Sequence, residues 1–152
     1  MSTHINFIPI NIAVVTISDT RVLDNDKSGD VLEKRVIKSN HKLISREIVK
    51  DDFDKISQLF LNLINNKKID VIISTGGTGL TGRDITPEVM KTLFEKTIDG
   101  FGEMFRWLSY SKIGTSALQS RALAGVSNGT YIFCLPGSPS ACRDGWDQIL
   151  IH

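Results

Sequence analysis

The residues best suited to chemistry in this chain lie in one glycine-rich polar loop. Four glycines fall within seven positions and are followed by a cation and an acid: Gly76, Gly77, Gly79, Gly82, Arg83 and Asp84. Glycines let the backbone turn sharply and approach a ligand closely, and successive N–H groups in such a loop can form a nest that binds anions. The loop is therefore either a binding site for a phosphate or carboxylate, or a purely structural turn.

The two charged residues that close the loop each have two interpretations. Arg83 either contacts an anion or is a solvated surface charge. Asp84 either holds a metal ion or a shared proton, or it accepts hydrogen bonds from nearby backbone N–H groups as a simple loop acid.

Two better known glycine motifs do not account for this loop. Residues 77–82 match the pattern G-x-G-x-x-G, but the helix after them begins only near Pro87, and the loop follows the third predicted strand instead of the first. No Gly-Lys-Ser or Gly-Lys-Thr follows the glycines, so the Walker A pattern is absent from the sequence. The sequence therefore argues against a dinucleotide site and against a P-loop.

Three further acids follow the two strands predicted before the loop. Asp19 comes after the apolar run 10–17, and Asp51 and Asp52 follow the strand predicted over 41–49. If these strands are parallel, their carboxyl ends meet at one edge of the sheet, where open α/β sheets bind ligands. Carboxylates beside a phosphate-binding loop suit a magnesium–nucleotide complex. The alternative for Asp51 and Asp52 is capping of the helix that follows.

A second junction between a strand and a helix has the same two possibilities. Pro136, Gly137 and Ser138 follow an apolar strand and precede a helix that begins at Pro139. They either form another anion site at a helix N-terminus, or Ser138 only caps that helix.

The elements that must position these residues alternate along the chain. Strands are predicted over 10–17, 41–49, 69–74 and 130–135, and helices over 29–38, 53–64, 87–94, 99–110, 116–123 and 139–150, with a turn over 125–129. This alternation predicts a three-layer α/β fold, in which a doubly wound, mostly parallel sheet carries helices on both faces. A length of 152 residues suits one domain that spans 1–152 and begins with a short tail.

Composition narrows the function classes. The 18 basic and 17 acidic residues nearly cancel and form no basic block, so no nucleic-acid partner is expected. No stretch approaches transmembrane length, and residues 1–18 lack the basic region and cleavage site of a signal peptide, so we expect no membrane partner and a cytoplasmic location. Cys134 and Cys142 are expected to be buried thiols, because neither has the spacing of a metal or disulfide motif.

Six segments carry a resemblance to a known family. They are 16–20, 48–52, 74–88 (STGGTGLTGRDITPE), 100–106, 113–125 and 135–139. Over nearly its whole length the chain resembles the molybdopterin-binding family of molybdenum cofactor biosynthesis, which includes the MogA and MoaB proteins and the G domain of gephyrin. Segments 100–106 and 113–125 resemble the MoaB-type branch in particular.

This resemblance implies a compact α/β domain that assembles into a homotrimer, or a homohexamer in MoaB-type members. It implies that the protein binds molybdopterin and adenylylates it with Mg-ATP, releasing pyrophosphate. By motif position, catalysis and Mg²⁺ fall to Asp51 and Asp84. Ser18 matches a serine of the family's active site, and Gly76, Gly77, Thr78, Gly79 and Ser138 match its ligand-binding loops. The further candidates for ligand binding are Asp19, Thr75, Arg83, Pro136 and Gly137. The alternative is a protein without catalytic activity that carries molybdopterin or serves as a scaffold for other proteins of the pathway.

Aromatic residues near the end of the chain are candidates for an oligomer contact. An exposed apolar surface is expected around Phe101, Phe105, Trp107 and Trp146, although burial in the core is the simpler interpretation of the two phenylalanines.

Overall fold

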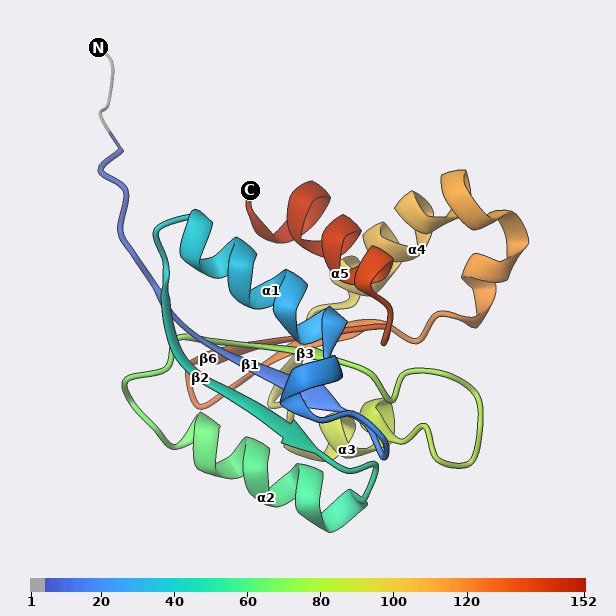
Figure 1. Cartoon of the computed structure of the whole chain (residues 1–152), viewed down its shortest axis with the longest axis horizontal. Coiled ribbons are helices and arrows are strands. Elements are labelled where there is room, and N and C mark those ends of the chain that lie inside the picture. The colour runs from blue at the N-terminus through green and yellow to red at the C-terminus, as the bar shows by residue number, and fades with distance from the viewer. Residues whose placement is uncertain (1–4) are drawn as a thin grey trace.

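A six-stranded sheet forms the centre of the molecule, as the computed structural model shows for residues 5–152 (Figure 1). Its strands are β1 (Asn11–Ile17), β2 (Lys42–Val49), β3 (Val71–Thr75), β4 (Lys96–Thr97), β5 (Leu123–Ser127) and β6 (Thr130–Leu135). They lie in the order β2-β1-β3-β6-β5-β4. The first four in this order are parallel, whereas the pairs β6–β5 and β5–β4 are antiparallel. Residues 1–4 of the predicted N-terminal tail lie outside the described residues.

Helices cover both faces of this sheet (Figure 1). One face carries α1 (Lys27–Lys38), α4 (Asp99–Ile113), α5 (Pro139–Gly145) and the π-helical turn η3 (Trp146–Leu150). The opposite face carries α2 (Phe53–Ile64) and α3 (Thr86–Leu93). The remaining helical turns are η1 (Leu23–Asn25) and η2 (Gly114–Gln119). The predicted three-layer α/β architecture is therefore confirmed, with a mixed sheet.

Each space between the layers is filled by its own group of buried side chains. Phe60 of α2 and Met90 of α3 pack against one face of the sheet. Leu32 of α1 and Phe105 of α4 pack against the other. The strand β1 is buried over six of its seven residues, as a central strand covered on both faces requires.

The segment before β6 differs from the sequence prediction. The helix predicted over 116–123 is the end of the 3-10 turn η2, and Leu123 already begins β5. The predicted turn over 125–129 is mostly strand, because the reversal needs only Asn128 and Gly129, whose φ angles of 49° and 77° suit a two-residue hairpin turn. Gly125 belongs to β5, where a Cβ atom would lie 2.3 Å from the ring of Phe94.

The aromatic residues proposed for an oligomer contact divide into two groups. Phe101, Phe105 and Trp146 are at most 5% exposed and belong to the core, so Trp146 does not contribute to an exposed surface. Trp107 is 74% exposed.

The two cysteines are buried thiols, as predicted. Burial raises the pKa of Cys134 to about 12 and that of Cys142 to about 11, so both remain protonated at neutral pH. Among residues 5–152, no helix has the length and apolar character needed to cross a membrane.

Asp52, and not Asp51, caps the helix that follows β2. Its side chain accepts a hydrogen bond from the Lys55 N–H at 2.9 Å. We expect Asp52→Ala to lower the free energy of unfolding by about 1 kcal/mol, the usual cost of losing an N-cap. Urea denaturation measures this change. Asp54→Ala is the control, because Asp54 lies in the same turn without capping it, and an equal loss in both variants would contradict the prediction.

Candidate functional site

The carboxyl ends of β2, β1, β3 and β6 meet at one edge of the sheet. In the parallel register, Ile17 pairs with Val49. Thr75 pairs with Thr16 on one side and Leu135 on the other. The loops that follow these four strands therefore start side by side. The sequence predicted this meeting for the strands that precede the glycine loop.

The glycine loop is fixed to this edge at its first two residues. Gly76 and Gly77 have φ angles of 104° and 69°, which side chains other than glycine rarely adopt. Gly76 packs so closely on β1 that a Cβ atom would lie 2.1 Å from the Ile17 carbonyl oxygen. Thr86, at the start of α3, donates from its hydroxyl to the Gly76 carbonyl and from its N–H to the Gly77 carbonyl, both at 3.0 Å.

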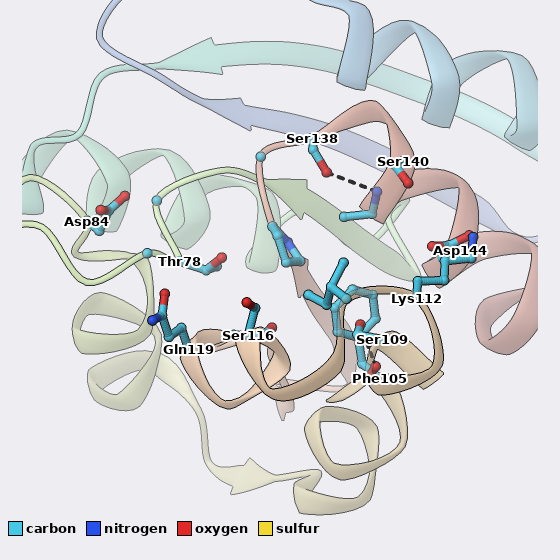
Figure 2. Close-up of a pocket in the computed structure, with 17 residues that line it drawn as sticks. Thr78, Asp84, Phe105, Ser109, Lys112, Ser116, Gln119, Ser138, Ser140 and Asp144 are labelled. Carbon is cyan, nitrogen blue, oxygen red and sulfur yellow. Dashed lines mark hydrogen bonds and ion pairs between the residues drawn. The ribbon is translucent and has the colours of Figure 1, made fainter. Parts of the chain in front are cut away.

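Two cavities open beside this loop and share part of their walls. The larger has a volume of about 510 Å³ (Figure 2), and the smaller about 280 Å³. Gly77, Asp84 and Gly137 line both cavities. The structure thus offers two adjoining sites that meet at a carboxylate and two glycines.

Most of the predicted site residues line one of the two cavities. Those in the larger cavity alone are Thr78, Gly79, Pro136 and Ser138, and those in the smaller alone are Ser18, Asp51, Thr75 and Gly76. The hydroxyl of Ser138 also accepts a hydrogen bond from the Ala141 N–H at 3.0 Å, so it caps α5 as the alternative interpretation required (Figure 2).

Asp19 and Arg83 line neither cavity. They form a two-bond ion pair with each other, with N–O distances of 2.9 Å, and thereby join the loop after β1 to the glycine loop. Asp19 also accepts a hydrogen bond from the Asp51 N–H at 3.2 Å. The hydrogen bond from Arg83 lowers the pKa of Asp19, so this acid is ionised and already partnered.

Among Asp19, Asp51, Asp52 and Asp84 at this edge, Asp51 is the one whose side chain makes no hydrogen bond or ion pair within residues 5–152. Its Oδ1 atom is buried and accepts no hydrogen bond within the described residues. Burial raises the pKa of Asp51, and the nearby charges of Asp19 and Asp84 raise it further. An unpaired carboxylate oxygen beside the Gly77 backbone is where a cation or a ligand proton would be stabilised.

Asp84 has the structural role that the sequence allowed, and its position leaves the proposed metal or proton role open. As a loop acid, it accepts hydrogen bonds from the N–H and hydroxyl of Thr81 at 3.0 and 2.6 Å. Both bonds go to Oδ2, while the side chain lies in the wall between the two cavities.

The far wall of the larger cavity was not predicted from the sequence. Phe105, Ser109 and Lys112 of α4 line it, and Lys112 pairs with Asp144 of α5 (Figure 2). The turn η2 adds Ser116 and Gln119. A signal was present, because 105, 109 and 112 share one helical face and become polar towards the C-terminal end of α4.

Comparison with known proteins connects this site to a family. The family model described as "Probable molybdopterin binding domain" matches residues 13–152. "Molybdenum cofactor biosynthesis protein B" of Escherichia coli is 44% identical over 144 residues, which cover 95% of this chain and 85% of the relative. The "Probable molybdopterin adenylyltransferase" of Methanocaldococcus jannaschii is 41% identical over 141 residues, covering 88% of this chain and 83% of the relative.

Solved structures agree with this relationship. A crystal structure of molybdenum cofactor biosynthesis protein B superposes with a TM-score of 0.91 at 41% identity, covering 95% of this chain and 90% of the other. The tungsten cofactor synthesizing protein MoaB from Pyrococcus furiosus gives a TM-score of 0.84 at 35% identity, covering 93% and 91%. The chain therefore belongs to the molybdopterin-binding family of molybdenum cofactor biosynthesis proteins and groups with its MoaB-type members.

Proposed function

We propose that this protein binds molybdopterin and adenylylates it with Mg-ATP, releasing pyrophosphate. The observation that carries the proposal is the pair of adjoining cavities that share Gly77, Asp84 and Gly137. A transfer between two substrates needs two sites whose reacting ends meet, and the shared wall is such a meeting point. The name of the Methanocaldococcus relative supports this reaction type.

The chemistry fits the residues at the junction. The terminal phosphate of molybdopterin attacks the α-phosphorus of ATP, a new P–O bond forms, and the bond from that phosphorus to the bridging oxygen of pyrophosphate breaks. The attacking oxygen is already anionic, so no strong base is required. Catalysis therefore depends on holding two anions in line and reducing their repulsion. The backbone N–H groups of residues 77–79 suit this task, whereas the Gly76 N–H donates to the Leu135 carbonyl.

Asp51 and Asp84 fit the magnesium that accompanies ATP. No group of three or more potential metal-binding side chains occurs within residues 5–152, so the protein does not form a complete metal cage there. Magnesium needs only one or two carboxylates when phosphates and water supply its other ligands. The unpartnered Oδ1 of Asp51 meets that requirement. When bound, Mg²⁺ would neutralise part of the phosphate charge.

The direct test is product formation. The protein is incubated with molybdopterin and Mg-ATP, and both adenylylated molybdopterin and pyrophosphate are measured by chromatography, with an active relative assayed in parallel. We expect both products in equal amounts. Two results together would contradict catalysis: no turnover under conditions in which the relative reacts, and an affinity for molybdopterin that Mg-ATP does not change. They would favour a carrier or scaffold of the pathway.

The raised pKa of Asp51 predicts an acid limit to the reaction. If ionised Asp51 is required, the rate falls as the pH drops through its raised pKa. Asp19→Asn removes a repelling charge, and it also frees Arg83, whose charge lowers this pKa. The acid limb of the kcat/KM–pH profile, which reports groups of the free enzyme, should therefore move to lower pH. The control is Asp99→Asn on exposed α4 surface, and a limb that moves equally in both variants would contradict this origin.

We also propose a homotrimer or homohexamer that acts in the cytoplasm as a single domain over 1–152. Exposed apolar side chains on α4 and η2 support an oligomer contact: Met104, Trp107, Tyr110, Ile113 and Leu118, each at least 51% exposed. Light scattering should give three or six times the chain mass of 16.9 kDa. Trp107→Glu should lower this mass, whereas Leu61→Glu on α2 should not. A monomeric wild type at micromolar concentration would exclude the assembly.

A further inference from the structure

The segment 79–84 projects from the sheet edge and carries Asp84 back to the cavity wall. Its residues up to Arg83 are exposed, and its internal hydrogen bonds join only Thr81 with Asp84. Gly79 and Gly82 within it add backbone freedom. Apart from the ion pair between Arg83 and Asp19, which joins the segment to the loop after β1, these contacts are local and do not hold both ends of the segment.

Arg121 supplies a second attachment, which comes from a distant part of the chain and reaches both ends of the segment. It lies between η2 and β5, and its Nε donates to the Gly79 carbonyl at 2.8 Å. Its Nη2 donates to the Asp84 carbonyl, also at 2.8 Å. Its Nη1 pairs with Glu88 in the first turn of α3. One planar guanidinium therefore joins both ends of segment 79–84 to the helix that follows.

The backbone on either side of Arg121 is itself fixed to α4. Arg106 donates from Nη1 to the carbonyls of Ser120 and Ala122 at 3.3 and 3.1 Å. Gly102 lies against the same Ala122 carbonyl, where a Cβ atom would be only 2.6 Å away. Arg121 thus begins from a rigid support, and only its own side chain spans the gap to the loop.

We propose that Arg121 is a positioning residue, which fixes segment 79–84 and so places the Asp84 carboxylate between the two cavities. Arg121 lines neither cavity, so it acts through the loop and not on a ligand. The fork geometry of the guanidinium is essential, because a lysine ammonium keeps the charge but cannot donate to three separated oxygens from one plane.

The first test is amide hydrogen exchange, which is independent of the reaction. Arg121→Lys should speed exchange of the Thr81 and Asp84 amides, which donate the hydrogen bonds within the segment, by about tenfold or more, since two charge-assisted hydrogen bonds that hold the segment are lost. Arg35→Lys is the matched control, because Arg35 makes a two-bond pair with Asp147 on another part of the surface. Unchanged exchange in Arg121→Lys, or the same local increase in Arg35→Lys, overturns the proposal.

The second test rests on the proposed function and asks whether Arg121 works through Asp84. Arg121→Lys should lower kcat about 100-fold with little change in either KM, because a small displacement of a catalytic group has that effect. In an Asp84→Asn background the same change should have almost no further effect. Equal losses in both backgrounds overturn the proposal. If wild type does not turn over, the proposed function fails, and the exchange experiment alone decides the role of Arg121.

Discussion

Asp84→Asn is expected to lower kcat for adenylylation by about 10³-fold, the upper range for removing one group that stabilises transition-state charge. Asp84 is the one acid that borders both cavities, so it is placed to hold the Mg²⁺ that would neutralise charge where the two phosphates meet. Asparagine keeps an oxygen that can accept the hydrogen bonds from Thr81, so the loop should retain its shape. Single-turnover kinetics at saturating molybdopterin and Mg-ATP measure the loss.

The control for Asp84→Asn is the same replacement at Asp70. Asp70 lies before the opposite end of β3, where its carboxylate accepts a hydrogen bond from the Asn11 N–H at 2.8 Å. Asp70→Asn should leave kcat unchanged. Affinity of the Asp84 variant for molybdopterin alone should remain within a few-fold of wild type. A single-turnover rate within threefold of wild type would show that Asp84 is only a loop acid.

Gly76→Ala is expected to lower the free energy of unfolding by about 3–5 kcal/mol, because two separate costs combine. The φ angle of 104° strains any residue with a Cβ atom. The added carbon would also lie 2.1 Å from the Ile17 carbonyl oxygen, which belongs to backbone and cannot rotate away. Relief requires β1 and β3 to separate at the edge that carries the site, so ligand affinity should fall as well.

Urea denaturation of Gly76→Ala and Gly82→Ala, compared with each other, separates the cost of the close contact from the change in loop entropy that any Gly→Ala replacement causes. Gly82 lies in the same loop, has no positive φ, and has nothing within 4 Å of an added Cβ atom. Its replacement should change stability by no more than about 0.5 kcal/mol. Equal midpoints for the two variants would mean that the close contact of Gly76 with β1 has no energetic weight.

The sheet edge could be predicted because it depends on order along the chain. Alternating strands and helices lead to parallel pairing, and parallel pairing brings residues after β1, β2 and β3 together whatever their side chains do. Assigning a role to each acid needed coordinates. Asp51 and Asp52 are neighbours in sequence, yet one caps α2 and the other keeps an unpaired oxygen.

The parts that were not predicted depend on contacts between distant segments. The sequence predicts a turn at Gly125, whereas in the structure a glycine is needed there because the ring of Phe94 occupies the space that a Cβ atom would fill. Asp19 and Arg83 were both expected to bind ligand, but only the folded chain shows that they satisfy each other across 64 positions. Hydrophobic periodicity identified the core face of α4, which includes Phe105. The face that lines the cavity could be recognised only once the structure showed α5 lying opposite it.

The shared wall of the two cavities has a thermodynamic consequence. Gly77, Asp84 and Gly137 line both cavities, so we expect a ligand in either one to order them and to reduce the entropy cost of binding in the other. Linkage requires the effect to be reciprocal: the factor by which nucleotide raises the affinity for molybdopterin equals the factor by which molybdopterin raises that for nucleotide. Calorimetric titrations in either order, with an ATP analogue whose α–β bridge cannot be cleaved, should therefore give the same coupling free energy. The protein would then favour the doubly occupied state, in which transfer can occur, over either half-filled one.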